Sequence, residues 1–267
     1  MAYIQLTIAS NEYQQEELIS LLDDYNPTGF EQRENELIAY FNETEFDEKA
    51  IENIIHGYPY LQSRVEQKNW NEEWEKNFQP VVVENFCAVR ADFHQSIEGV
   101  EHEIIITPKM SFGTGHHATT YMMIQQMKDL DFKGKKVFDF GTGTGILAIL
   151  ADKLGSESVS AIDVDEWSIQ NAEENIRRND CSHICLKLSS VIPEKQYDIV
   201  LANINRNVIL QYLNQLNTSV VINGLLLLSG ILAADKQVIT DAFTKVGFIE
   251  RKTLSKDNWL SLLFVKG

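Results

Sequence analysis

Residues 137–147 read VFDFGTGTGIL, an apolar run that passes directly into a turn rich in glycine. The composition predicts a buried strand over residues 137–140 and a helix over residues 145–154. Glycines in such a turn let the backbone approach a ligand that a Cβ atom would keep away. Open α/β sheets bind their ligands at the carboxyl ends of their strands. The segment therefore predicts an α/β fold with a small-molecule site at this turn.

The spacing of the glycines indicates which ligand binds there. A dinucleotide fingerprint has the pattern G-x-G-x-x-G/A, whereas the glycines here are at 141, 143 and 145, and position 146 is isoleucine. We expect Asp139, two residues before Gly141, to lie near the ligand, where it disfavours a pyrophosphate and suits a ligand with positive charge. S-adenosylmethionine carries an amino group and a sulfonium and has no phosphate. We therefore expect S-adenosylmethionine as the cofactor and disfavour a nicotinamide dehydrogenase.

A carboxylate ends the next predicted strand, residues 159–163. Asp163 lies 22 residues after Gly141, the length of one helix and one strand. A carboxylate at this place can accept hydrogen bonds from both ribose hydroxyls. Its other ordinary role would be to cap the following helix, but Asp165 directly precedes the helical run and suits that role better. Asp163 is therefore a candidate ribose ligand.

An amide ends the strand predicted over residues 198–204. The Asn203 side chain offers one carbonyl acceptor and two donors. It could hold the amino-acid end of the cofactor or the incoming amine. Capping of the following helix is again better served by a neighbour, Asn205.

Strands and helices alternate through this part of the chain. Further strands are expected at 184–188 and 225–229, and further helices at 166–179, 208–216 and 235–246. Apolar strands between helices indicate a mostly parallel sheet covered on both faces. Two last strands, 248–254 and 259–265, are joined by a short polar turn and must be antiparallel. We predict a Rossmann-like domain over residues 81–267 with an antiparallel terminal hairpin.

The first 67 residues predict a separate, smaller unit. Strands at 3–9, 29–33, 36–42 and 61–67 with helices at 11–25 and 47–57 give the order βαββαβ, a ferredoxin-like α+β arrangement. This segment has no cluster of catalytic residue types, and we interpret it as a recognition module. Trp70, Trp74 and Phe78 have helical spacing before Pro80, which predicts a linker helix over residues 68–80.

Acidic residues are concentrated at the front of the chain. The net charge is −16, and residues 1–60 contribute 13 acidic and 2 basic side chains, a net of −11, whereas residues 111–267 contribute 17 and 16. Such a front end repels phosphate backbones, so direct nucleic-acid binding is not expected, and it attracts a basic partner. A merely solvated surface is the alternative interpretation.

The sequence lacks the usual features of a membrane-bound or secreted protein. The sequence contains no run of about 18 apolar residues, so it predicts no membrane-spanning helix. The first residues lack the basic region of a signal peptide. Three cysteines (Cys87, Cys181 and Cys185) cannot form a disulfide framework, which favours a reducing compartment. We expect a cytoplasmic protein without membrane partners.

A second glycine-rich segment, residues 107–120, reads TPKMSFGTGHHATT. Glycines with several polar side chains predict a lid or substrate loop. His116 and His117 could ligate a metal, but no third and fourth ligand follow at a recognised spacing. We therefore expect no metal.

Three of these segments together resemble the PrmA family, the bacterial methyltransferases of large-subunit ribosomal protein eleven. They are FGTGHHATT at 112–120, DFGTGTGILA at 139–148 and ANI at 202–204, and the segment WNEEWEK at 70–76 is also similar to that family's linker. The glycine turn alone would indicate only a class I methyltransferase, and the combination is narrower. The resemblance covers essentially the whole chain. Ala118 departs from it, because the family usually has proline there.

The resemblance implies a class I S-adenosylmethionine-dependent methyltransferase that modifies lysine ε-amines, and the α-amine, of that ribosomal protein. It implies that Thr120, Gly141, Asp163 and Asn203 contact S-adenosylmethionine. The implied substrate is basic, which fits the acidic front of the chain. No residue is an evident general base, so the sequence assigns no catalytic residue.

Two other function classes remain open at this point. An RNA or DNA nitrogen methyltransferase shares the cofactor turn, but usually has Asn/Asp-Pro-Pro-aromatic where this chain has Asn203-Ile204-Asn205-Arg206. A non-catalytic ribosome-assembly binder would keep the acidic module and lack cofactor affinity.

Overall fold

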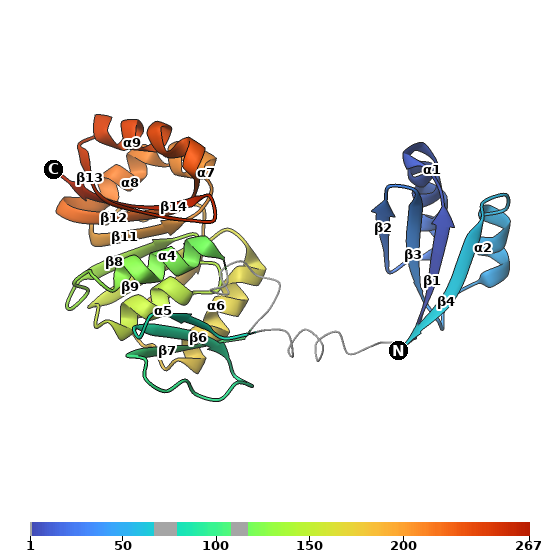
Figure 1. Ribbon diagram of the computed structural model, residues 1–267, viewed down its shortest axis with the longest axis horizontal. Helices are drawn as coiled ribbons and strands as arrows, with labels where there is room; N and C mark the ends of the chain where they lie inside the picture. Colours follow the sequence, from blue (N-terminus) through green and yellow to red (C-terminus); the bar gives the residue numbers. More distant parts are fainter. Residues whose placement is uncertain (1, 67–78, 108–116) are drawn as a thin grey trace. The chain divides into compact units, whose positions relative to one another are not determined.

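The computed structural model describes residues 2–66, 79–107 and 117–267 (Figure 1). The chain divides into two compact units, Met1–Phe78 and Gln79–Gly267, and each is described by itself. The linker helix predicted at 68–80 lies almost wholly outside the described residues, as do residues 108–116 of the second glycine-rich segment. Among the described residues, no helix combines the length and apolarity needed to cross a membrane.

The first unit has the predicted element order, β-α-β-β-α-β. Its elements are β1 (Ala2–Ala9), α1 (Glu12–Leu22), a 3-10 turn η1 (Asp23–Tyr25), β2 (Gly29–Arg33), β3 (Glu36–Asn42), α2 (Glu48–Ile54) and β4 (Tyr60–Glu66). The strands form an antiparallel sheet in the order β2-β3-β1-β4. Asn11 caps α1 by accepting from Gln14 N, and the Gln14 side chain accepts from Asn11 N in return.

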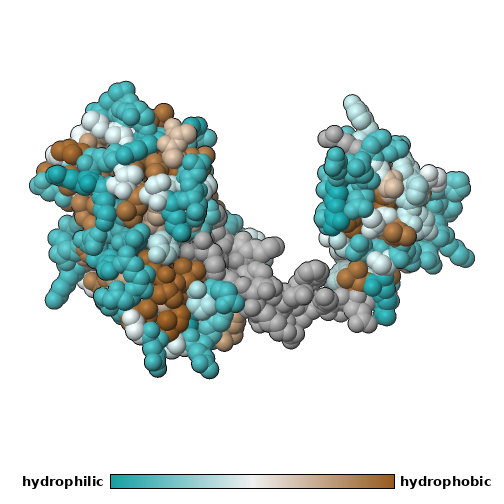
Figure 2. All heavy atoms as spheres, in the orientation of Figure 1, coloured by the Kyte–Doolittle hydropathy of each residue, from teal (hydrophilic) through white to brown (hydrophobic). Residues whose placement is uncertain are grey.

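Alternation along β1 places the apolar core of this unit on one face of the sheet. Ile4, Leu6 and Ile8 lie opposite three apolar residues of β3, and the helices cover them with Leu18, Leu22, Ile51 and Ile55. Nearly all of these side chains are fully buried, which stabilises each by about 1.5–3 kcal/mol. The acidic side chains of this unit whose burial the structure describes are exposed or half-buried, and hydrophilic residues cover much of its visible face (Figure 2).

The second unit begins with a small sheet. It consists of β5 (Val81–Val83), β6 (Cys87–Ala91) and β7 (His102–Ile106), with β6 and β7 parallel. The helix α4 (Ala118–Met127) leads from there into the main sheet.

A seven-stranded sheet forms the centre of the second unit. Its elements are β8 (Lys136–Phe140), α5 (Ile146–Lys153), β9 (Ser158–Asp163), α6 (Glu166–Arg178), β10 (Ile184–Leu188), β11 (Tyr197–Asn203), α7 (Arg206–Gln211), α8 (Leu213–Ser219), β12 (Val220–Leu232), a 3-10 turn η2 (Ala233–Asp235), α9 (Lys236–Lys245), β13 (Phe248–Lys256) and β14 (Trp259–Lys266). The strand order is β10-β9-β8-β11-β12-β14-β13, and only β14 runs in the direction opposite to the other strands. This is the predicted fold, a mostly parallel sheet that ends in an antiparallel hairpin.

Helices cover both faces of this sheet: α4, α5 and α6 lie on one face, and α7, α8 and α9 lie on the other (Figure 1). On the second face, Phe138, Val200 and Leu226 from adjacent strands pack with Ile209 and Phe243 from the helices. The last two strands form the β13–β14 hairpin, in which β14 inserts antiparallel between β12 and β13, so the sheet ends at β13.

In the second unit, two predicted elements differ clearly from the observed ones. The helix expected at 208–216 is two helices, because the backbone at Tyr212 (φ −98°, ψ 13°) leaves helical geometry and its ring packs edge-on against Phe140 at 5.0 Å. The strand expected at 225–229 extends over 13 residues and shifts register between Ser229 and Ile231. Gly230 occupies that bulge at a φ of +81°.

Candidate active site

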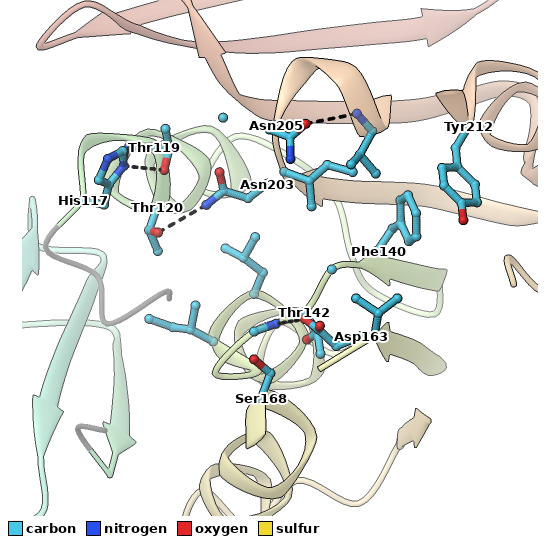
Figure 3. Close-up of a pocket in the computed structure, with 18 of the residues that line it drawn as sticks. His117, Thr119, Thr120, Phe140, Thr142, Asp163, Ser168, Asn203, Asn205 and Tyr212 are labelled. Atoms are coloured by element: carbon cyan, nitrogen blue, oxygen red, sulfur yellow. Dashed lines mark hydrogen bonds between the residues drawn. The ribbon is translucent and has the colours of Figure 1, made fainter. Parts of the chain in front are cut away.

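A cavity of about 650 Å³ opens at the carboxyl ends of β8, β9 and β11 (Figure 3). All four residues singled out from the sequence, Thr120, Gly141, Asp163 and Asn203, line it. Much of the remaining wall is apolar, from Phe140, Ile146, Leu147, Val164, Ile204, Val208, Tyr212 and Trp259. A mostly apolar cleft with a few convergent polar groups is the usual form of a small-molecule site.

The glycine turn forms one wall of the cavity. Gly141, Gly143 and Gly145 have φ values of +74°, +55° and +80°, a region that side chains disfavour. A Cβ at Gly141 would overlap the Ile204 side chain, and a Cβ at Gly145 would lie 3.2 Å from Ala172 Cβ. Glycine is therefore required here by conformation and by close packing, which leaves the backbone amides of the turn near the cavity.

Hydrogen bonds fix the Asp163 carboxylate beside this turn. One oxygen, Oδ2, accepts from Gly143 N at 2.8 Å, and Oδ1 accepts from Asp165 N at 3.0 Å. Capping of α6 falls to Asp165, as predicted, because its Oδ2 accepts from Ser168 N at 2.9 Å. Asp163 is thus held in place at the cavity with acceptor capacity remaining on both oxygens.

The Asn203 amide faces the cavity from the end of β11 (Figure 3). Its Nδ2 donates to Thr120 Oγ1 at 3.3 Å, while its Oδ1 is buried and accepts no hydrogen bond from the residues that the structure describes. Asn205 caps α7 through Val208 N at 3.1 Å, as predicted. A buried, unpaired acceptor costs about 1–3 kcal/mol. The unpaired Oδ1 of Asn203 therefore indicates that a bound ligand donates a hydrogen bond to it.

Asp139 does not line the cavity, contrary to the expectation that it would lie near the ligand. It is one residue from the end of β8 and is 1% exposed. Its Oδ2 accepts from Thr142 Oγ1 at 2.6 Å, and its Oδ1 is buried without a described partner. Burial raises the pKa of Asp139 to about 7, from an ordinary 3.8. Asp139 therefore supports the glycine turn from the protein interior, through its hydrogen bond with Thr142.

Asp139→Asn is expected to stabilise the protein at alkaline pH. A raised carboxyl pKa means that the folded state binds the proton more tightly, so folding stability falls as pH rises from about 4 to about 7. Asparagine keeps the acceptor for Thr142 and removes the buried charge. Urea unfolding at pH 8 should show a gain of up to about 4 kcal/mol, shrinking towards pH 4.

The matched control for this variant is Asp131→Asn, at an exposed carboxyl. This change removes no buried charge and should give no comparable gain in stability at pH 8. If Asp139→Asn and the wild-type protein have equal free energies of unfolding at both pH values, the buried charge of Asp139 is not destabilising and the prediction is wrong.

Among the cavity residues that the sequence analysis did not single out are Trp259 and Gly230. Trp259, at the start of β14, packs edge-on against the His117 ring with 5.0 Å between centroids. Gly230 reaches the cavity from the β12 bulge, and a Cβ there would overlap the Ile204 carbonyl oxygen. A glycine inside an apolar strand was the available signal, since it indicates a bulge or a close backbone approach.

His117 acts as the N-cap of α4. Its ring nitrogen Nδ1 accepts from Thr119 N at 3.3 Å and lies 2.8 Å from Thr119 Oγ1. Within the described ranges, no group of three His, Cys, Asp or Glu side chains could hold a metal ion.

Comparison with known proteins assigns this architecture to a family. The family model described as ribosomal protein L11 methyltransferase (PrmA) matches residues 3–267. The chain belongs to the ribosomal protein L11 methyltransferase family. Similar proteins of that name are found in Phocaeicola vulgatus (35% identical over 279 residues, 99% of each chain) and Porphyromonas gingivalis (39% over 246 residues, 88% of this chain and 85% of that one).

Solved structures agree on the fold of this L11 methyltransferase family member. The ribosomal protein L11 methylase of Lactobacillus delbrueckii subsp. bulgaricus has a TM-score of 0.66 and 27% identity, over 71% of this chain and 99% of that chain. A Thermus thermophilus 16S rRNA methyltransferase in complex with AdoMet and guanosine has a TM-score of 0.50 and 17% identity, over 59% and 45%, and shows the fold alone. Family membership favours a ribosomal protein methyltransferase over the RNA or DNA methyltransferase alternative.

Proposed function

We propose that this chain transfers methyl groups from S-adenosylmethionine to amino groups of ribosomal protein L11. The observation that carries the proposal is the convergence of Thr120, Gly141, Asp163 and Asn203 on one largely apolar cavity. An L11 methyltransferase is what the related proteins are named. The lysine ε-amino group is the proposed acceptor, with the α-amino group as a further one.

The residues at the cavity fit this cofactor. Asp163 has acceptor capacity for ribose hydroxyls, and the unpaired Oδ1 of Asn203 suits an ammonium or amine donor. The glycines of residues 141–145 allow the backbone to approach the methionyl part, and apolar side chains such as Val164 suit the adenine ring. When bound, S-adenosylmethionine supplies a methyl group on a positively charged sulfur.

The chain's own contribution is to hold a neutral amine against that methyl group. A lysine with a pKa of about 10.4 costs roughly 4–5 kcal/mol to deprotonate at pH 7. The apolar wall around Phe140 and Trp259 lowers this cost by disfavouring the charged amine. Asn203 Oδ1 accepts one amine N–H and orients the lone pair, and such positioning contributes several kcal/mol. No general base is assigned.

The acidic first unit is proposed to recognise the substrate. Residues 1–60 carry a net charge of −11, and a ribosomal protein is basic. Complementary charge raises the encounter rate and weakens with salt. The same charge disfavours direct binding to ribosomal RNA, so the free protein is the proposed substrate and the cytoplasm, where ribosomal proteins are made, is the proposed compartment.

Methyl transfer to defined acceptors tests this proposal. Radiolabelled S-adenosylmethionine is incubated with purified free L11, with stripped ribosomal RNA and with whole ribosomes. Label in free L11, located on amino groups by mass spectrometry, is the expected result. Label in RNA alone would contradict the proposed substrate and would still support S-adenosylmethionine as the cofactor. Cofactor binding without transfer to any of the three would overturn the acceptor.

Asn203→Ala is expected to lower kcat on the order of 100-fold at saturating cofactor, because the amine loses the acceptor that orients it. The control is Asp165→Ala, which removes the cap of α6 at a residue that does not line the cavity. That control should cost about 1 kcal/mol of stability and leave kcat near the wild-type value. Single-turnover transfer to L11 separates the two; equal kcat values in both variants would contradict the role of Asn203.

A further inference from the structure

Two asparagines on one face of α6 hold the end of β7. Asn175 and Asn179 are four residues apart, so they lie one turn apart on the same face of the helix. Asn179 exchanges two hydrogen bonds with the backbone of Ile105, accepting from its N at 2.9 Å and donating to its O at 2.6 Å. Asn175 Oδ1 accepts from Thr107 N at 2.7 Å. Both contacts join segments about 70 residues apart in the chain.

Asn175 makes a second contact that Asn179 lacks. Its Nδ2 donates to Thr144 O at 2.8 Å, and the side chain is fully buried. Thr144 lies inside the glycine turn, directly before Gly145, the N-cap of α5. One amide therefore ties the end of β7 and the glycine turn to the same point on α6.

The glycine turn has a particular need for such an anchor. Three of its residues are glycines at positive φ, and glycine has more accessible backbone conformations than other residues. Backbone hydrogen bonds from the first two residues of the turn to Ile162 O hold its start, and Asn175 adds a fixed point at Thr144 O, near its end. On the cavity side, Gly143 N donates to Asp163, the proposed ribose ligand, so that bond shares its acceptor with the cofactor. Asn175 holds the turn from within the protein, through a group that no ligand has to share. A turn ordered in advance avoids the entropic cost of ordering on binding.

We infer that Asn175 is a positioning residue for cofactor binding, which presets the glycine turn by bonding Thr144 O while anchored to Thr107 N. The inference rests on the proposed S-adenosylmethionine site. Asn179, which holds β7 without touching the turn, is the structural counterpart and has no such role.

Two substitutions at Asn175 and one at Asn179 test the inference. Asn175→Ala removes both hydrogen bonds, and Asn175→Asp keeps the acceptor for Thr107 N but faces Thr144 O with a carboxylate. Both variants should raise the Kd for S-adenosylmethionine at least tenfold by calorimetry, with kcat at saturating cofactor within about threefold of wild type. Asn179→Ala should lower Tm and change Kd less than twofold.

The pH dependence separates a positioning role from general destabilisation. When protonated, the carboxyl introduced by Asn175→Asp donates to Thr144 O in place of the amide. The Kd defect of Asn175→Asp relative to wild type should therefore narrow between pH 8 and pH 5.5, whereas that of Asn175→Ala stays constant. Parallel defects at all pH values, or equal Kd changes in the Asn175 and Asn179 variants, would overturn the inference.

A measurement without cofactor distinguishes failure of this inference from failure of the proposed function. Amide hydrogen exchange over residues 142–146 of the unliganded protein should accelerate in both Asn175 variants and stay at the wild-type rate in Asn179→Ala. Unchanged exchange in the Asn175 variants would overturn the inference even where cofactor binds. Accelerated exchange in a protein whose wild type binds no S-adenosylmethionine would overturn the proposed cofactor and leave the anchor standing.

Discussion

Gly230→Ala is expected to weaken S-adenosylmethionine binding by about 100-fold, or about 2.7 kcal/mol. Gly230 has a φ of +81°, and alanine in that left-handed region costs about 1–2 kcal/mol. Its new Cβ would also overlap the carbonyl oxygen of Ile204 and lie 2.7 Å from the carbonyl carbon. Backbone cannot rotate away as a flexible side chain can, so either the bulge or the segment after β11 must move.

Movement of that segment displaces Ile204 and Asn203, the residue before it, and both line the proposed cofactor cavity. A hydrogen bond from Ile204 N to Ser229 O, at 3.2 Å, joins this segment to β12 directly beside Gly230. A shift of either segment therefore moves the other, and both segments line the cavity. Calorimetric titration with the cofactor measures the affinity, and thermal unfolding measures the loss of stability.

Gly247→Ala is the matched control for this prediction. Gly247 also has a positive φ, +95°, but no heavy atom lies within 4 Å of a Cβ built there. The control therefore carries the conformational cost without the overlap, and it should lower Tm while leaving the cofactor Kd near wild type. Similar Kd values in the two variants would mean that the Gly230 overlap relaxes without disturbing Asn203.

The sequence predicts this site as far as local rules reach. Capping preferences are local, so assigning Asp165 and Asn205 to the helix starts left Asp163 and Asn203 for the cavity. The structure confirms both caps and places Asp163 and Asn203 at the cavity, which Asn205 also lines. The order of strands and helices is also a local property, because apolar runs and their spacing define each element.

Long-range pairing explains what the sequence could not predict. Gly230 and Trp259 reach the cavity because β11 pairs with β12 and β12 pairs with β14, at registers that no short stretch of sequence specifies. Asp139 was placed at the ligand from its position before the glycines. Its actual burial follows from Phe140 being the last residue of β8, so that Asp139 lies one residue inside the sheet.

Asp163→Ala is expected to raise the Kd for S-adenosylmethionine about 100-fold and to leave kcat at saturating cofactor within about threefold. Hydrogen bonds to a charged acceptor contribute about 1.5–3 kcal/mol each, and the proposed pair to the ribose is lost together. The reacting methyl group is not contacted by Asp163 in this scheme, so turnover should suffer less than binding. Asp163→Asn retains one acceptor oxygen, so its Kd for S-adenosylmethionine should lie between those of the wild-type protein and Asp163→Ala. Asp165→Ala, which loses only a helix cap, should keep the wild-type affinity.

Loss of affinity in Asp163→Ala has a second source that must be separated from the first. The carboxylate also accepts from Gly143 N, so its removal loosens the glycine turn as well as the ribose contact. A cofactor analogue without ribose hydroxyls distinguishes the two by a double-mutant cycle. If Asp163 binds the ribose, the analogue loses affinity for the wild-type protein but shows little further loss in the variant. If the carboxylate serves only the turn, the analogue and the substitution weaken binding independently, and their free energies add.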